Sequence, residues 1–199
     1  MICIVDYGAG NIGSVRNMLR KLGLEVIVSS QEKDLRSCEK LILPGVGSFD
    51  YAMHNLKKSG LYDLLNELVL YDQKPILGVC LGMHLMTRAS EEGVESGLGW
   101  IEADVKRFTL DDLPVPHMGW NYIKQRQNTT PFQIDDFRRF YFAHSYYVDC
   151  DHQDDIFFET VYGHSFVSAF RRKNIMGVQF HPEKSHMFGK NLFRFFCEL

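Results

Sequence analysis

Apolar residues in the first half of the chain follow two alternating spacings. Short runs rich in β-branched residues predict strands at residues 2–5, 24–28, 41–43 and 75–79. Between them, apolar residues recur every three or four positions and predict helices over 11–22, 49–58 and 61–71. This alternation is typical of an α/β protein, in which helices pack on both faces of a parallel sheet.

The second half of the chain has a different pattern. From Leu98 onward, aromatic and β-branched runs separated by turn-like segments predict mixed or antiparallel strands; the runs are WIEADVKRF, WNYI, RFYFAHSYYV, FVSAF and IMGVQF. Loops are expected at 110–116 and 149–155, where proline or acidic residues concentrate. A last amphipathic helix starts between His186 and Gly189 and buries Leu192, Phe193, Phe195 and Phe196.

Composition agrees with this picture. With 199 residues, 45% hydrophobic and 24% charged, the chain has the make-up of one globular domain over residues 1–199. Its formal charge of −3, with scattered Lys and Arg, argues against nucleic acid or an anionic membrane as a partner. The N-terminal MICIVDYGAG is typical of a first strand and not of a signal peptide, and no apolar run approaches membrane-spanning length.

The five cysteines are odd in number, widely spaced and free of any CxxC pair: Cys3, Cys38, Cys80, Cys150 and Cys197. This usage predicts reduced thiols in the cytoplasm, without a disulfide framework or a zinc site. We expect no metal and no cofactor.

Two glycine-rich segments resemble nucleotide-binding loops. GAGNIG, at residues 8–13, matches the GxGxxG pattern, which also needs a carboxylate at the end of the second strand. The chain has Ser29, Ser30 and Gln31 there, so a tight structural turn is favoured. PGVG, at residues 44–47, lacks the GK[ST] ending of a phosphate-binding loop.

The clearest chemical signal lies in LGVCLGMHLM, residues 77–86. A strand followed at once by a helix puts Cys80 in a sharp turn, and Gly78 and Gly82 keep that turn uncrowded. G-x-C-x-G has the steric logic of the nucleophile elbow G-x-S-x-G, and a helix start favours the thiolate. We prefer a nucleophile to the alternative, a small buried hydrophobe, which is how most free cysteines behave.

A nucleophilic thiol needs a base held by a third group. His84 lies about one helical turn after Cys80 and points along the helix, so it is not the base that we choose. In VQFHPEKS, an extended backbone would place His181 and Glu183 on the same side of the chain. Spacing alone leaves the alternative, an exposed surface ion pair, equally open.

Acyl transfer also needs backbone donors for an oxyanion. One candidate is the amide of Leu81, and the other is the PGVG loop, which leaves the neighbouring strand at the same edge of the sheet. Gly45 and Gly47 would let that loop turn its amides toward the sulfur. A plain glycine turn is compatible with this.

Six blocks of sequence occur in an order that matches a known family: LPGVGSF (43–49), GVCLGM (78–83), GLGWI (97–101), PHMGWN (116–121), YFAHSYY (141–147) and GVQFHPEKS (177–185). Together they resemble the class I glutamine amidotransferases, most closely the glutaminase subunits of imidazole glycerol phosphate synthase. The resemblance implies a flavodoxin-like, parallel-centred sheet with flanking helices and added antiparallel strands in the second half.

The resemblance also implies residue roles. Cys80 would attack the side-chain amide of L-glutamine, with His181 as base and acid and Glu183 as the orienting carboxylate. Ammonia would leave a glutamyl thioester, which water then hydrolyses to glutamate. The oxyanion donors would be Leu81 and either Val46 or Gly47, and the substrate would be held by Gly47, Ser145 and Tyr146.

Members of this family pass ammonia to a (βα)8-barrel cyclase subunit, so a heterodimer is expected. The face that carries Asn11, Met118, Trp120 and Asn121 is the expected contact, although Met118 and Trp120 could instead be core residues.

The chain departs from the family at one position. Four residues after the cysteine the family usually has a glutamine that helps hold the substrate, whereas this chain has His84, a shorter side chain that can be charged near neutral pH. One alternative function is therefore the same chemistry feeding another synthase, such as one that amidates surface sugars. A second is a catalytically idle scaffold, which the complete set of Cys80, His181 and Glu183 argues against.

Overall fold

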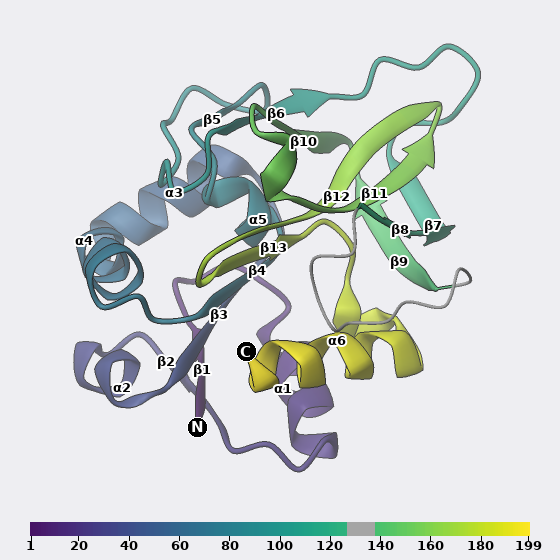
Figure 1. Ribbon diagram of the computed structural model, residues 1–199. Coiled ribbons are helices and arrows are strands. Elements are labelled where there is room, and N and C mark those ends of the chain that lie inside the picture. The colour runs from purple at the N-terminus through teal and green to yellow at the C-terminus, as the bar shows by residue number, and fades with distance from the viewer. Residues whose placement is uncertain (127–137) are drawn as a thin grey trace.

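The computed structural model describes residues 1–126 and 138–199 (Figure 1). One half of its main sheet consists of five parallel strands in the order β2-β1-β3-β4-β13. These are β2 (Val26–Ser29), β1 (Ile2–Val5), β3 (Lys40–Gly45), β4 (Ile76–Cys80) and β13 (Ile175–Val178). The predicted parallel centre of the sheet is confirmed.

The second half of the chain extends the same sheet with mostly antiparallel strands. They are β12 (His164–Arg172), β10 (Tyr146–Cys150), β6 (Ala103–Arg107), β5 (Ala89–Ser90), β11 (Ile156–Tyr162) and β8 (Lys124–Gln125). A separate antiparallel ribbon pairs β7 (His117–Tyr122) with β9 (Arg139–His144). This ribbon borders the cavity described below.

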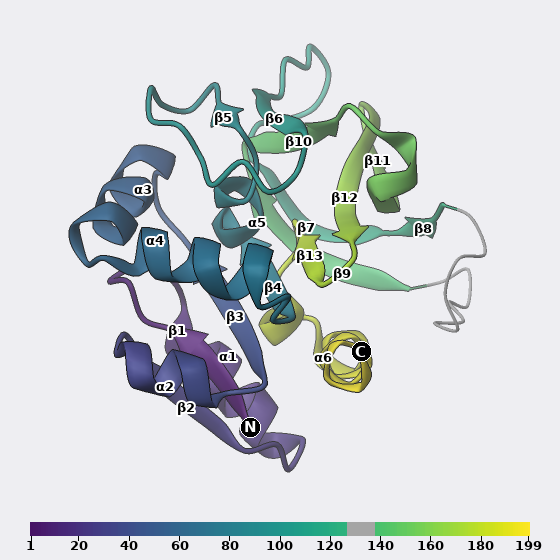
Figure 2. The same cartoon turned by 60° about the vertical axis from the view of Figure 1, so that its left-hand side comes forward.

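Helices cover both faces of the parallel half, and Figure 2 gives a second view of these layers. On one face, α1 (Ile12–Lys21) and α6 (His186–Glu198) lie beside each other and share an apolar cluster that includes Val15, Leu19, Leu192 and Phe193. The other face carries α2 (Glu32–Ser37), α3 (Phe49–Lys58), α4 (Leu61–Asn66) and α5 (Leu81–Leu85). No helix in the described ranges is long and apolar enough to cross a membrane.

Most predicted elements are present, with ends shifted by one or two residues. The helix expected over 61–71 is α-helical only to Asn66 and continues as the π-helical turn η1 (Glu67–Tyr71). α2 was not predicted, because a six-residue helix with a single buried side chain, Leu35, is too short to show a period. The run RFYFAHSYYV forms two strands, β9 and β10, separated at Ser145.

The loop expected at 110–116 contains no helix or strand, as predicted. The loop expected at 149–155 is wrong in part. β10 continues to Cys150 because its backbone pairs with β6, where Cys150 faces Ala103, and η2 (Gln153–Asp155) is a 3-10 turn. Pairing with a neighbouring strand outweighed the acidic composition of this segment.

α5 sits unusually close to the strands beneath it. A Cβ at Gly82 would lie 1.9 Å from the carbonyl oxygen of Leu43, and a Cβ at Gly45 would lie 2.5 Å from the amide nitrogen of Gly82. Glycine is therefore required by the packing of the turn after β4, and not only by its backbone angles.

We expect Gly82→Ala to lower the free energy of unfolding by about 3 kcal/mol or more, because the new methyl group meets backbone that cannot move aside. Gly13→Ala is the matched control. A Cβ at Gly13 in α1 meets nothing within 4 Å, so this change should stabilise the protein by about 0.5–1 kcal/mol. Urea unfolding measures both variants, and equal effects would contradict the packing argument.

Candidate active site

Cys80 occupies the turn between β4 and α5. Its backbone has φ 54° and ψ −110°, a region that costs a residue other than glycine about 1–3 kcal/mol. Such strain persists only where the surrounding structure holds it, and here the close glycine contacts of α5 do so. The predicted elbow is therefore present, with Cys80 largely buried at the carboxyl end of β4.

His181 and Glu183 form a buried pair, although not in the way that their spacing suggested. The expected extended backbone is wrong, because Pro182–Lys184 forms the 3-10 turn η3. This turn brings the Glu183 carboxylate back to His181, with 2.9 Å between Nδ1 and Oε1. Only 5% of the His181 side chain and 1% of the Glu183 side chain is exposed, so an exposed surface ion pair is excluded.

The charges around His181 favour its protonated form. Burial alone lowers the pKa of the imidazole, but hydrogen bonds to Cys80 and Glu183, together with their charges, outweigh burial and raise the pKa to about 10. Since Glu183 takes Nδ1, the remaining nitrogen, Nε2, faces the sulfur. The fold thus brings Cys80 together with His181 and Glu183, which follow it by 101 and 103 positions in the sequence.

The backbone of His181 is held by the β7–β9 ribbon. Its N–H donates to the carbonyl oxygen of Tyr141 over 2.8 Å, and the Ser185 hydroxyl donates to the carbonyl oxygen of His181 over 2.7 Å. Ser185, fully buried, also accepts the N–H of Tyr141. Sequence reasoning missed this support, which becomes visible only when β9 and η3 meet.

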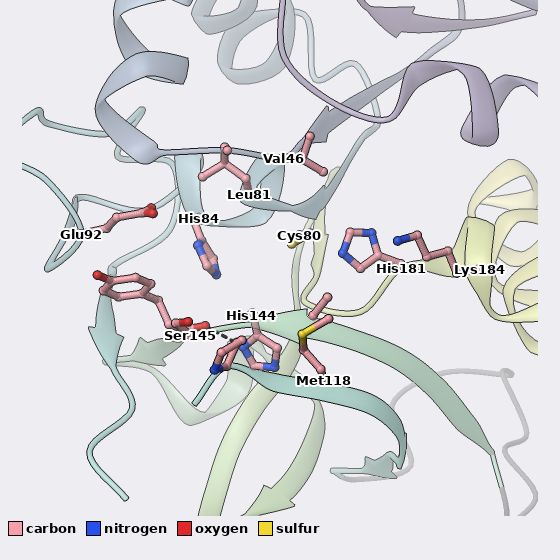
Figure 3. Close-up of a pocket in the computed structure, with 14 residues that line it drawn as sticks. Val46, Cys80, Leu81, His84, Glu92, Met118, His144, Ser145, His181 and Lys184 are labelled. Carbon is pink, nitrogen blue, oxygen red and sulfur yellow. Dashed lines mark hydrogen bonds between the residues drawn. The ribbon is translucent and has the colours of Figure 1, made fainter. Parts of the chain in front are cut away.

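A cavity of about 370 Å³ opens beside the sulfur (Figure 3). This lies within the usual range for small-molecule sites, about 300–1,000 Å³. Its walls include every residue expected to form the oxyanion hole or to bind substrate: Val46, Gly47, Leu81, His84, Ser145 and Tyr146. Cys80 and His181 line the same cavity (Figure 3), whereas Glu183 contacts His181 and is not among the lining residues.

Glu92 also lines this cavity and was not predicted. Burial raises the pKa of its carboxyl group, against the lowering effect of the Phe49 N–H that donates to Oε2 over 3.1 Å. Asp50 holds the loop after Glu92 in place, because its carboxylate accepts hydrogen bonds from the backbone N–H groups of Val94 and Glu95. Glu92 therefore joins the start of α3 to the cavity wall.

The PGVG loop is held from the other side by the first loop of the chain. The buried Tyr7 hydroxyl donates to the carbonyl oxygen of Pro44 over 2.6 Å. Gly8 and Gly10 have positive φ, and a Cβ at Gly10 would lie 3.1 Å from the Pro44 side chain. GAGNIG thus forms the tight turn that was favoured above, packed against the PGVG loop.

His84 is buried and neutral. Its Nε2 lies 2.8 Å from Oε1 of Gln179, and burial lowers its pKa to about 4 despite the raising effect of that hydrogen bond. The expectation that His84 can be charged near neutral pH is therefore wrong, because burial disfavours the imidazolium.

Two further buried histidines lie at the cavity: His144 lines it, and His117 contacts His144. His144 donates Nδ1–H to the carbonyl oxygen of Tyr146 over 2.7 Å, so its Nε2 accepts from His117 Nδ1 over 2.9 Å. His117 Nε2 in turn accepts from Asn121 over 3.2 Å. Burial lowers the pKa of His117 to about 4 and that of His144 to about 3. The Tyr146 carbonyl can only accept a hydrogen bond, so each group in this series donates toward it: Asn121 to His117, His117 to His144, and His144 to Tyr146.

These neutral histidines predict acid sensitivity. Their folded pKa values lie below the unfolded value near 6.5, so the stability they contribute is complete above that pH and is lost as the pH falls toward 4. Each contributes a slope of up to about 1.4 kcal/mol per pH unit. We expect the urea midpoint of His144→Gln to fall less between pH 7 and pH 5 than that of the parent; equal slopes would contradict this.

Three of the four residues expected at a partner interface lie on β7: Met118, Trp120 and Asn121. Met118 is 63% exposed and Trp120 40%, so the alternative that they are core residues is wrong. Trp120 stacks on His186 with 5.5 Å between ring centroids, and Arg139 lies over the same indole. Asn121 is partly exposed, and Asn11 lies at the start of α1.

Known proteins agree with this fold. The family model described as "Glutamine amidotransferase class-I" matches residues 3–199, and the chain therefore belongs to that family. A solved structure titled "Crystal structure of glutamine amidotransferase" superposes with a TM-score of 0.78 at 18% identity, covering 100% of this chain and 98% of that one. A structure of PurLQS from Thermotoga maritima gives 0.74 at 17%, covering 99% and 97%. These two likenesses support the fold alone.

Within this class, relatives of high identity define a narrower group. Proteins named "Imidazole glycerol phosphate synthase subunit HisH 2" from Methanococcus maripaludis and Pseudomonas aeruginosa are each 50% identical to the chain. The matches cover 100% of this chain and 99% and 100% of those proteins. The chain is thus an enzyme of the glutamine amidotransferase class with full-length likeness to HisH subunits.

Proposed function

We propose that the protein is the glutaminase subunit of an imidazole glycerol phosphate synthase in histidine biosynthesis, working in the cytoplasm as a single domain over residues 1–199. The observation that carries the chemistry is the buried contact of His181 with both Cys80 and Glu183 at the mouth of one cavity. Identity of 50% to HisH proteins over the whole chain supports the pathway.

In the proposed reaction, the Cys80 thiolate attacks the amide carbon of glutamine while His181 holds the proton as imidazolium. Collapse of the tetrahedral intermediate breaks the C–N bond, and His181 gives its proton to the departing ammonia. Water, deprotonated by the now neutral His181, attacks the thioester and releases glutamate. Glu183 keeps Nδ1 protonated and stabilises the imidazolium in each step.

The cavity walls suggest how glutamine is oriented. The amide nitrogen of Leu81 and those of Val46 or Gly47 are the proposed oxyanion donors, because both segments border the sulfur at the sheet edge. Glu92 offers a carboxylate for the substrate ammonium group. Ser145 and Tyr146 would hold the amino-acid end, with the Tyr146 carbonyl fixed by His144.

The proposed partner is a (βα)8-barrel cyclase that receives ammonia and completes a heterodimer. The exposed Met118 and Trp120 lie on the ribbon that borders the cavity, so a partner seated there would cover its mouth. Asn11 and Asn121 complete the proposed contact. Aromatic and Met side chains are enriched at the centres of such interfaces.

Purifying the chain with its native partner tests this function. A 1:1 complex with a barrel cyclase that makes imidazole glycerol phosphate from glutamine is the expected result. Trp120→Ala should weaken that complex while Tyr71→Ala, at an even more exposed aromatic residue on η1, should not. A sugar-modifying synthase as the only partner would overturn the pathway and leave the glutaminase chemistry standing. This outcome is tested because His84 stands where the family usually has glutamine, a difference that fits a surface-sugar synthase as the acceptor of ammonia.

A further inference from the structure

Gln179 is a fully buried amide that the mechanism above does not use. It directly follows β13, which pairs in parallel with β4 so that Val178 lies opposite Val79. The next residue of each strand is Gln179 on one side and Cys80 on the other. The pairing therefore brings the Gln179 side chain to the Cys80 sulfur from the β13 side of β4, whereas the PGVG loop approaches from the β3 side.

The two ends of this amide have different neighbours. Its Oε1 lies 2.8 Å from Nε2 of His84, and its Nε2 lies 4.0 Å from the sulfur of Cys80. An amide oxygen only accepts, so the neutral His84 must carry its proton on Nε2. The reverse orientation would point the amide oxygen at a sulfur that is negative when paired with imidazolium, and is disfavoured by repulsion.

We propose that Gln179 is a further catalytic residue, whose amide N–H stabilises the Cys80 thiolate, and that His84 is a positioning residue that holds this amide in the donating orientation. The proposal rests on Cys80 being the nucleophile. The N···S distance is long for a hydrogen bond at rest, and catalytic hydrogen bonds commonly tighten when substrate binds.

This assigns a reason to the one departure from the family. His84 donates its Nε2–H to Gln179, and its other ring nitrogen, Nδ1, carries no proton. His84 therefore has no N–H left to donate to the substrate, whereas a glutamine side chain at this position would have one. Its work is then on the nucleophile, through Gln179, and not chiefly on the substrate. A buried, neutral imidazole suits this, because burial lowers the pKa of His84 to about 4 and so favours the uncharged form.

The test is the pH profile of Cys80 alkylation by iodoacetamide in the full chain, located by peptide mass. Burial raises the pKa of Cys3 and Cys150 to about 12, so both react slowly near neutral pH. Titratable groups around the cavity also affect this profile and are unchanged in the comparison: Glu92, His144, His181 and Lys184 line it, and Tyr7 interacts electrostatically with Cys80.

We expect Gln179→Met, which keeps the length of the side chain but removes the amide, to raise the alkylation midpoint by about 0.5–1 pH unit and to lower kcat about 3- to 10-fold. His84→Phe should shift the midpoint in the same direction, although it does not touch the sulfur. His84→Gln restores a donor for Oε1 and should leave the midpoint at the parent value.

The double variant separates positioning from independent action. If His84 acts through Gln179, the combined Gln179→Met and His84→Phe change shifts the midpoint no further than Gln179→Met alone. Ser168→Ala is the matched control, because Ser168 is equally buried and its backbone carbonyl keeps the Gln179 N–H over 2.9 Å. It should keep the parent profile.

A parent-like midpoint in Gln179→Met would overturn the proposal, and additive shifts in the double variant would overturn the role of His84. Should Gln179→Met fail to fold, the comparison of His84→Phe with His84→Gln decides, since equal midpoints for those two contradict the relay. Failure of the proposed function looks different: Cys80→Ala would then still release ammonia from glutamine.

Discussion

Cys80→Ala is expected to abolish ammonia release from glutamine, with a loss of more than about 10³-fold in kcat/KM. Alanine removes the sulfur that forms the thioester, and no other nucleophilic cysteine borders the cavity among its described residues. The fold should survive, because alanine meets the same backbone strain as cysteine at φ 54°. Glutaminase activity is measured as glutamate produced by the chain in complex with its partner.

The same complex supplied with ammonium salt should still turn over, because the acceptor reaction then bypasses Cys80. Cys197→Ala is the matched control: Cys197 is also a free cysteine but lies near the end of α6, far along the chain from the elbow. Parent-rate glutamine hydrolysis by Cys80→Ala would show that the nucleophile is another group.

Glu183→Gln carries the second largest expected effect, a fall in kcat of about 10²–10³-fold. The carboxylate holds Nδ1–H of His181 at 2.9 Å and helps to raise the pKa of the imidazole to about 10. In the variant, the amide no longer supplies a negative charge, so the imidazolium is lost at a lower pH. The alkaline limb of the pH profile of kcat should therefore shift to lower pH.

The pH dependence of stability has the same origin. Because the folded pKa of His181 lies above its unfolded value near 6.5, the stability from its charged form is complete below that pH and is lost as the pH rises toward 10.

Glu32→Gln is the matched control for Glu183→Gln. It removes an exposed ion pair with Arg36 whose N···O distance, 2.7 Å, is shorter than that of the buried pair. Exposed ion pairs contribute only about 0–1 kcal/mol to stability. Because this pair is also not part of the cavity wall, Glu32→Gln should leave glutaminase activity unchanged.

The pairing of His181 with Glu183 illustrates what spacing can and cannot say. The two-residue separation predicted that the side chains would meet, and they do, but through a 3-10 turn and not an extended strand. The spacing left an exposed surface pair open as well. Their burial depends on the tertiary structure, in which η3 packs against α1, α6 and β9.

His84 shows the opposite case. The sequence singled it out as a departure from a family pattern and suggested that it can be charged. Its neutral state follows from burial, which outweighs the opposite effect of the hydrogen bond to Gln179, a residue 95 positions away that no local pattern connects to it. Glu92, Tyr7 and Ser185 were missed for the same reason, since their contacts with Phe49, Pro44 and Tyr141 join segments that are distant in the chain.

The sequence by itself determined the alternation of strands and helices, the elbow at Cys80 and the likeness to glutamine amidotransferases, because periodicity, glycine spacing and ordered blocks are local properties of the chain. The tertiary structure decided which groups meet at the sulfur, which histidines are neutral, and that Met118 and Trp120 face outward. Burial and charge at a site depend on every element packed around it, and that environment exists only once the parallel strands β4 and β13 lie side by side.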